Sequence, residues 1–314
     1  MSRRDLPATL LVIVGPTGSG KTDLAHALAL EEGGEVVSAD AFAVYRGLDV
    51  GTAKPSPERR REVRYHMVSV ADPWEPFSAG RFASEARPIV EQIARRGRLP
   101  ILCGGSGFYV SALLGGLPPG PALTQGLRPA LARWARMRGP EAAHRFLSAN
   151  DPVAAARIPA ANLKYTLRAL EILLSTGEAA SARAGSGDDW AATLHVRKLG
   201  LLLPRAQLHA RIEDRVRRML ESGWGEEVRR LLEGGLSRDS NSFQAIGYRE
   251  VAEWMLGRIS REEAEEQIVS ATRSLAKRQM TWFARERDIR WVGPEEGLAA
   301  GRALLSEATD EETR

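Results

Sequence analysis

The sequence predicts an α/β protein in which helices flank a parallel sheet, and three features indicate this class. Short apolar runs alternate with longer amphipathic segments over the first hundred residues, a pattern typical of a parallel sheet with helices on both faces. A glycine-rich turn directly follows the first apolar run. Residues 117–195 lack strand signals and are rich in alanine and arginine. This stretch therefore predicts an all-helical insertion in the α/β core.

The first elements follow one another in a regular order. Short apolar runs predict strands at 10–14, 35–39 and 99–103, and amphipathic segments predict helices near 21–31 and 80–96. Together they form the first part of the core, which we assign to residues 1–116.

The chain then changes character. The segments "GLPPGPALTQG" and "ARAGSGDDWA" predict linkers at either end of the helical insertion, 117–195. The run "VRKLGLLLP", 196–204, predicts a strand that returns to the core. Residues 196–314 complete the core, are mostly helical, and end in a polar tail, 306–314, that we expect to be mobile.

Composition and charge place the chain among globular proteins. It has 314 residues, of which 43% are hydrophobic and 27% charged, and a formal net charge of +4. Cys103 is the single cysteine, which excludes a disulfide framework and is typical of a reducing cytosol. No stretch approaches the roughly 20 apolar residues of a membrane span. We therefore expect a cytoplasmic protein without a membrane segment.

The glycine-rich turn has the spacing of a P-loop. In "LLVIVGPTGSGKTDLA", residues 10–25, the pattern G-x-x-x-x-G-K-T places Gly15, Gly20, Lys21 and Thr22 between a strand and a helix. Backbone N–H groups of such a loop surround phosphate oxygens, the lysine adds charge, and the threonine hydroxyl is a ligand for Mg²⁺. The fold class is therefore a P-loop NTPase-like core.

A second feature separates this loop from that of most nucleoside triphosphatases. Those enzymes carry an apolar strand that ends in an aspartate. In "LPILCGGSGFY" the apolar run 99–103 is instead followed by two glycines and Ser106. Asp40 follows another strand, "VVSAD", and lies at the carboxyl edge of the sheet, where open α/β folds bind ligands. Its carboxylate can serve as a metal ligand, a general base, or a cap of a helix or turn.

Several motifs together resemble the tRNA dimethylallyltransferase family, and the resemblance covers nearly the whole chain. The most specific are "DVGTAKP" within "AFAVYRGLDVGTAKP" (41–55) and "AKRQMTWF" within "ATRSLAKRQMTWF" (271–283). In the same order as in the family, the chain also carries the P-loop, "GGSGFY", "DPVAAARI" (151–158), "RALEI" (168–172) and "AIGYRE" (245–250).

The resemblance implies a prenyl transfer from dimethylallyl diphosphate to the exocyclic N6 of adenine 37, next to the anticodon of tRNA. Asp40 would take the N6 proton as general base. Lys21, Mg²⁺ on Thr22 and the loop amides would stabilise the leaving diphosphate. Ser106 stands where the family has a threonine that contacts the diphosphate. The predicted diphosphate-binding residues are Gly15, Pro16, Thr17, Gly18, Ser19, Gly20, Lys21 and Thr22.

The family also places an arginine beside the diphosphate, in the helix "QLHARIEDRVRRML". Leu208, Ile212 and Val216 mark its core side. Arg211 and Arg215 lie on a neighbouring stripe, and we expect one of the two to contact the diphosphate. The alternative is a solvated basic face.

A basic helix near the end of the chain is the expected tRNA-binding element. At about 100° per residue, Arg273, Lys277, Arg278 and Arg285 fall on one arc of the helix, opposite an apolar side. Without the resemblance, a solvated charged face is an equal interpretation, and Arg273 at the edge of the stripe has the alternative of pairing with an acid. The other expected tRNA contacts are Asp40, Ala41, Phe42, Ala43, Ser106, Arg128, Lys164, Arg168, Gln244, Gly247, Tyr248, Arg249 and Trp282.

Two of these expectations depend on local details. In "QAIGYRE" a turn glycine beside Tyr248 and Arg249 suits an unstacked base. Ala41 and Ala43 replace a family serine and glutamine, so base recognition there rests more on backbone groups.

We expect a monomer that binds the anticodon stem-loop.

Three other functions are compatible with parts of the sequence. An adenylate isopentenyltransferase would need neither the insertion nor the basic helix. An ATP-dependent kinase or NTPase is disfavoured by the missing carboxylate after the 99–103 strand. A tRNA-binding protein with an inactive P-loop is disfavoured because Lys21, Thr22 and Asp40 are all present.

Overall fold

The computed structural model describes residues 8–115, 126–183 and 189–312. Contacts divide the chain into two compact units, one of Met1–Leu114 with Trp190–Arg314 and one of Gly115–Asp189. The sheet strands are β1 (Ala8–Val14), β2 (Glu35–Ser38), β3 (Tyr65–His66), β4 (Pro100–Gly104), β5 (Leu194–Leu201) and β6 (Ile289–Val292). The helices of the larger unit are α1 (Lys21–Glu31), α2 (Pro57–Glu62), α3 (Ala79–Arg95), α4 (Gly107–Gly115), α9 (Arg205–Glu221), α10 (Trp224–Glu233), α11 (Tyr248–Met255), α12 (Arg261–Phe283) and α13 (Gly297–Glu312).

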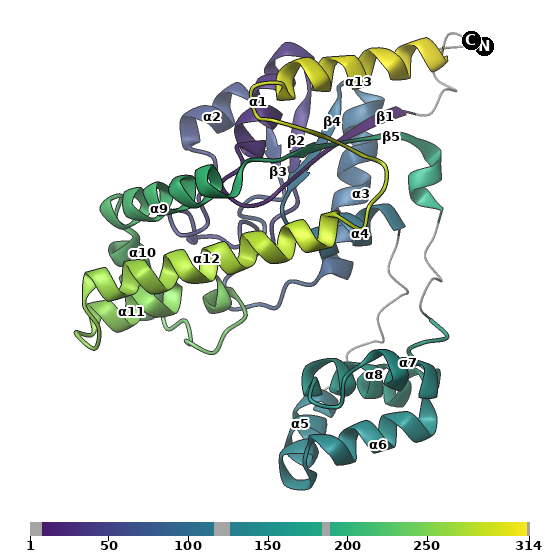
Figure 1. Ribbon diagram of the computed structural model, residues 1–314, viewed down its shortest axis with the longest axis vertical. Coiled ribbons are helices and arrows are strands. Elements are labelled where there is room, and N and C mark those ends of the chain that lie inside the picture. Colours follow the sequence, from purple (N-terminus) through teal and green to yellow (C-terminus); the bar gives the residue numbers. More distant parts are fainter. Residues whose placement is uncertain (1–7, 116–125, 184–188, 313–314) are drawn as a thin grey trace. The chain divides into compact units, whose positions relative to one another are not determined.

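The larger unit is built on a six-stranded sheet in the order β3-β2-β4-β1-β5-β6 (Figure 1). Every neighbouring pair is parallel, so the carboxyl ends of the strands share one edge. At the centre, Leu11 of β1 is in register with Ile101 of β4 and Arg197 of β5. This confirms the predicted fold class.

Strand β1 is buried on both faces, which explains its continuous apolar sequence. Leu11 and Ile13 join a core cluster with Leu24 and Leu28 of α1 and Leu304 of α13. Helix α3 packs on β1, β2 and β4 and buries an apolar stripe that consists of Phe82, Ala86, Val90 and Ile93. The P-loop and the other strand-end loops are thereby held on a rigid, three-layered base.

The structure extends or corrects several element predictions. It adds two strands that the sequence did not predict, β3 and β6. Their signals are weak, because β3 has only two residues and β6 is interrupted by exposed Arg290. Strand β5 begins at Leu194, inside the range assigned to the insertion. Residues 306–312 of the predicted polar tail are helical, since α13 continues to Glu312.

The smaller unit has a core of its own. Its helices are α5 (Leu127–Arg138), α6 (Pro140–Asn150), α7 (Pro152–Arg157) and α8 (Leu163–Thr176). Leu131, Leu147 and Leu170 belong to one buried cluster that joins the four helices. Residues 116–125 of the first predicted linker and 184–188 of the second lie outside the described residues.

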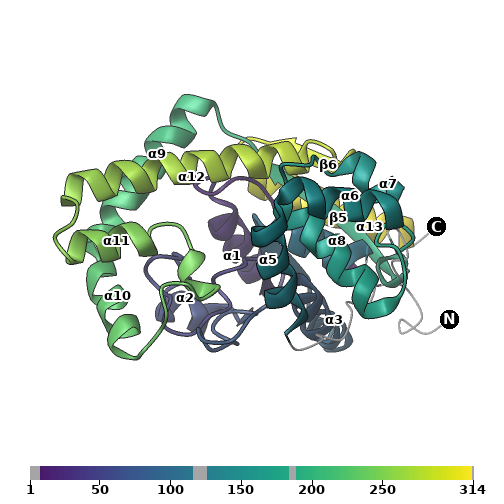
Figure 2. The ribbon, with the colours of Figure 1, turned by 90° about the horizontal axis from the view of Figure 1, so that it is seen from below.

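Helix α12 is the longest described helix and runs beside α9 and α11 (Figures 1 and 2). Ser260 begins it with a capping box, in which the Ser260 hydroxyl accepts from Glu263 N–H and the Glu263 carboxylate accepts from Ser260 N–H. In the described parts of the chain, no helix is long and apolar enough to cross a membrane.

Candidate active site

The P-loop connects β1 to α1 and has the expected compact shape. A β-carbon at Gly15 would lie 2.9 Å from the Leu201 carbonyl oxygen at the end of β5, so only glycine permits this approach. Gly20 has a φ of 90°, a left-handed conformation that glycine adopts without strain. Helix α1 begins directly after it at Lys21 and presents its N-terminus to the loop.

Two polar groups of the loop have capacity left for a ligand. The Ser19 hydroxyl oxygen is buried and has no hydrogen-bond partner among the described residues. Lys21 Nζ donates to the Pro16 carbonyl at 3.2 Å. Burial lowers the pKa of the Lys21 ammonium, and a bound anion would oppose this effect. The buried Ser19 hydroxyl and the half-buried Lys21 ammonium of this loop are therefore available to a phosphate group.

Asp40 lies in the loop after β2 and uses its two oxygens differently. Oδ1 accepts from Phe42 N–H at 2.8 Å and from Ala43 N–H at 3.1 Å. Oδ2 accepts no hydrogen bond from any residue that the structure describes. Asp40 is thus a turn cap through one oxygen, and the other oxygen is available for chemistry.

Ser106 is held next to this turn by close backbone packing. A β-carbon at Gly104 would overlap the Ala39 carbonyl, so the two loops approach closely after β4 and β2. Ser106 N–H donates to the Ala39 carbonyl at 3.3 Å, and the Ser106 hydroxyl accepts from Ala41 N–H at 3.2 Å. The hydroxyl proton is still available to a ligand.

A cavity of about 240 Å³ brings several predicted residues together. Its polar lining includes Thr17 of the P-loop, Asp40, and Arg215 of α9. Its apolar lining includes Phe42, Met219, Trp224, Ile246, Ile268 and Leu275, and Gln244 and Arg278 also contact it. A pocket with one carboxylate, cationic groups and an apolar wall suits a planar base and a short hydrocarbon.

The two candidate arginines of α9 lie at different depths. Burial lowers the pKa of the Arg215 guanidinium, while the nearby Asp40 carboxylate raises it. Arg211 is exposed, and its Nη1 would lie 3.7 Å from a β-carbon at Gly20. Arg215 therefore belongs to the cavity, and Arg211 to the outer edge of the P-loop. Leu208, Ile212 and Val216 are buried as predicted.

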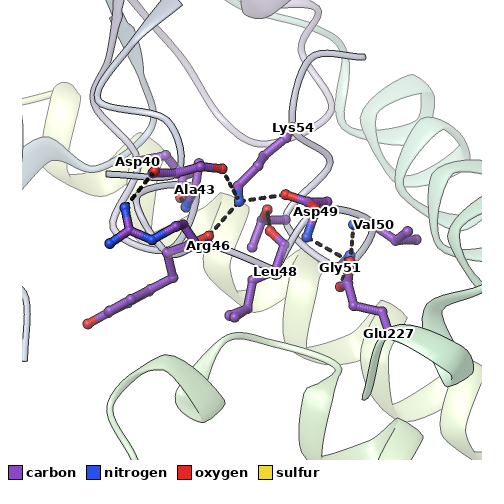
Figure 3. A network of polar contacts seen from close by, with 12 residues as sticks. Asp40, Ala43, Arg46, Leu48, Asp49, Val50, Gly51, Lys54 and Glu227 are labelled. Carbon is purple, nitrogen blue, oxygen red and sulfur yellow. Dashed lines mark hydrogen bonds and ion pairs between the residues drawn. The ribbon is translucent and has the colours of Figure 1, made fainter. Parts of the chain in front are cut away.

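The motif "DVGTAKP" forms a loop with buried polar anchors (Figure 3). The Glu227 carboxylate accepts from Asp49, Val50 and Gly51 N–H at 2.7, 2.7 and 3.1 Å and from the Tyr248 hydroxyl. The Lys54 ammonium, on a side chain that is 1% exposed, donates to Asp49 at 2.7 Å. These contacts fix the backbone around Gly51, which lines the cavity.

Glu227 is a residue that the sequence analysis missed. It is only 2% exposed, although it lies in a helix rich in charged residues. The available signal was its spacing, because Trp224, Val228 and Leu231 form an apolar stripe on which Glu227 also falls.

The structure contradicts the expectation for Tyr248. Its side chain is fully buried between Trp224 and Phe243, and so it offers no surface on which a base could stack. Gly247 has a φ of 96°, and its Cα faces the Trp224 ring. Of the same motif, only Gln244 and Arg249 are exposed. Ala43 is likewise buried, so its side chain contacts no ligand.

Helix α12 presents part of the predicted basic stripe. Lys277, Arg278 and Arg285 are exposed and line a groove with Trp282. Arg273 instead forms an ion pair with Glu213 of α9, which is the alternative that its position at the edge of the stripe had left open. Trp282 is 39% exposed and packs on Gly107, beside Ser106.

In the smaller unit, two predicted tRNA contacts share one acid. Arg128 and Arg168 donate to the Glu171 carboxylate at 2.8 and 2.6 Å. Glu171 is buried, whereas both arginine side chains are more than 40% exposed. Lys164 is exposed. The guanidinium groups are therefore oriented by Glu171 and remain accessible.

A metal at this site would need ligands from its substrate. No group of three or more His, Cys, Asp or Glu side chains forms a metal site in residues 8–115, 126–183 or 189–312. Thr22 is the second residue of α1, at the N-terminus that faces the loop. Together with the unpartnered Ser19 hydroxyl, the loop fits a hydrated cation that is bound mainly by phosphate oxygens.

Comparisons with known proteins agree over most of the chain. Residues 43–286 match the family "IPP transferase" and residues 8–69 match the family "Isopentenyl transferase". A tRNA dimethylallyltransferase from Thermomicrobium roseum is 44% identical over 90% of this chain and 85% of its own length. The enzyme of the same name from Koribacter versatilis is 42% identical over 95% and 96% of the two chains.

Solved structures show the same similarity. A tRNA isopentenylpyrophosphate transferase from Bacillus halodurans matches with a TM-score of 0.70 and 35% identity over 98% of this chain and 99% of that chain. A eukaryotic dimethylallyltransferase acting on tRNA matches with a TM-score of 0.82 and 26% identity over 98% and 80% of the two chains.

The Glu227 anchor predicts a large effect on stability. We expect Glu227→Ala to lower the free energy of unfolding by more than about 2 kcal/mol, because three part-buried backbone N–H groups and the buried Tyr248 hydroxyl lose their acceptor. Urea denaturation measures this change. Glu226→Ala, an exposed neighbour, is the matched control and should change stability by under about 0.5 kcal/mol. Equal effects of the two variants would contradict the anchor role.

Proposed function

Because the chain belongs to the IPP transferase family, which includes the tRNA dimethylallyltransferases, we propose the following reaction. The protein transfers the dimethylallyl group of dimethylallyl diphosphate to N6 of adenine 37 in tRNA and releases diphosphate. The observation that carries this proposal is the cavity that Asp40, with one carboxylate oxygen unoccupied, lines together with Thr17 and Arg215.

Asp40 acts as the general base. N6 of adenine is a weak nucleophile because its lone pair is delocalised into the ring. The C–N bond forms as the C–O bond to the diphosphate breaks, and the N6 proton passes to Asp40 Oδ2. Oδ1 stays bonded to the Phe42 and Ala43 amides, which fixes the orientation of the carboxylate during the transfer.

The P-loop binds the leaving diphosphate. Lys21, the loop amides and the Ser19 hydroxyl surround it, and Arg215 contacts it from α9. Ser106 donates its hydroxyl proton from the adjacent loop. These groups stabilise the negative charge that develops on the bridging oxygen. Mg²⁺ bound by Thr22 and diphosphate oxygens would neutralise further charge.

The exposed face of α12 binds the anticodon stem-loop. Lys277, Arg278 and Arg285 contact phosphates, and Arg128, Lys164 and Arg168 contribute from the smaller unit. Adenine 37 leaves the loop stack to enter the cavity, at a cost of a few kcal/mol that these contacts offset. The enzyme acts in the cytoplasm as a monomer.

A transfer assay tests the activity. Radiolabelled dimethylallyl diphosphate incubated with unmodified tRNA and Mg²⁺ should label the tRNA, whereas AMP in place of tRNA should stay unlabelled. ATP should not be hydrolysed when tRNA is present. Labelling of AMP at the same rate would instead identify a free-nucleotide enzyme, and tRNA-stimulated ATP hydrolysis would identify an NTPase.

The general base is tested by Asp40→Asn. The amide oxygen can still accept from Phe42 and Ala43 N–H, but the amide nitrogen cannot take a proton. We expect single-turnover transfer to slow by about 100-fold or more, with binding of both substrates within a few-fold of wild type. Asp214→Asn, on the exposed side of α9, is the control and should keep the wild-type rate. A nearly full rate for Asp40→Asn would reduce Asp40 to a cap.

The RNA-binding face is tested by salt dependence. Each lost phosphate contact should flatten the slope of log affinity against log salt by about 0.7 to 0.9. We therefore expect the double variant Lys277→Ala, Arg278→Ala to flatten it by about 1.4 to 1.8 units. The control Arg290→Ala, Arg302→Ala removes the same charge from exposed ion pairs elsewhere. If the two double variants have the same slope, α12 does not contact the RNA backbone.

A further inference from the structure

Gln279 of α12 connects the two loops that form the active site. Its Oε1 accepts from Thr17 N–H of the P-loop at 2.8 Å. A β-carbon at Gly105 would overlap the Gln279 amide nitrogen, so the same amide group also packs on the loop that carries Ser106. Gln279 is half-buried and fills the space between the two loops.

The same helix carries the cations that face solvent. Lys277 and Arg278 directly precede Gln279, and both are exposed in the groove with Trp282. Trp282 lies about one turn later and packs on Gly107. Residues 277–282 of this one helix therefore line the groove and also contact the P-loop and the Ser106 loop.

Such a connection makes the two binding events interdependent. A displacement or ordering of α12 moves the acceptor of the Thr17 amide, and Thr17 lines the cavity with Asp40. When two ligands favour the same arrangement of a shared element, each raises the affinity of the other by an equal factor. Thr17 and Gly105 are the residues through which α12 acts on the loops.

We propose that Gln279 is a positioning residue that couples RNA binding on α12 to diphosphate binding in the P-loop. This inference rests on the proposed function, because it takes the anticodon stem-loop and the diphosphate as the two ligands. RNA bound at Lys277 and Arg278 stabilises α12 in the position in which the Gln279 oxygen accepts from the Thr17 amide. It thereby favours the arrangement of the P-loop that binds the diphosphate. Gln279 touches neither reacting atom.

The experiment measures diphosphate binding by calorimetry on the full-length protein with Mg²⁺, with and without an unmodified anticodon stem-loop. No reaction occurs because no prenyl group is present. For the wild type we expect the stem-loop to tighten diphosphate binding at least about fivefold. For Gln279→Met, which keeps the volume of the side chain and loses the acceptor, we expect the two affinities to agree within about twofold.

Two further variants separate coupling from folding. Gln279→Glu keeps an acceptor for Thr17 N–H but adds a negative charge, so diphosphate binds more weakly in both states. The ratio of the two affinities cancels this common loss and should remain near the wild-type value. Gln267→Met, an exposed glutamine on the same helix, is the matched control and should behave like wild type.

The outcomes distinguish the inference from the function on which it rests. A wild-type ratio near one, or a full ratio in Gln279→Met, overturns the coupling role while the enzyme still binds RNA. Failure of the wild-type protein to bind the stem-loop overturns both the coupling role and the proposed function. A full ratio in wild type, Gln279→Glu and Gln267→Met, together with its loss in Gln279→Met, supports the coupling role.

Discussion

Close backbone packing at one edge of the parallel sheet sets the geometry on which the active site depends. The loops after β1, β2 and β4 meet there, and glycines at positions 15 and 104 let the P-loop approach β5 and let the Ser106 loop approach Ala39. A side chain at either position would separate the loops. Asp40, Ser106 and the P-loop are neighbours because main chains touch, not because their own side chains attract one another.

The charges of the site are unbalanced in a way that a diphosphate would correct. Lys21 and Arg215 are half-buried cations whose pKa values are lowered by burial, and the Asp40 carboxylate raises the pKa of both. A dianionic or trianionic ligand supplies the missing negative charge. A site that binds the proposed phosphate-bearing substrate in this way would carry some cost to the protein's own electrostatics, as expected where function and stability compete.

The sequence predicted most of the core because its signals are local. The apolar run 10–14 lies within buried strand β1, and the run 99–103 overlaps buried strand β4. The P-loop is identified by its glycine spacing alone, which is also a local signal. Tyr248 was mispredicted because burial depends on Trp224 and Phe243, which a local motif does not reveal. For the same reason Arg273 could not be assigned until Glu213 of another helix was placed beside it.

The orientation of the Asp40 carboxylate also bears on which bases can react. Since Oδ1 is occupied by two amides, only Oδ2 would meet the incoming base in the proposed reaction, and a carboxylate can only accept hydrogen bonds. Adenine presents an N–H donor at its 6-position. Guanine and hypoxanthine present a carbonyl oxygen there, which would place two acceptors against each other in a desolvated site. With Asp40 as the general base, one fixed carboxylate would select the purine by the polarity of a single exocyclic group, and the same contact that activates the nucleophile would exclude the wrong base.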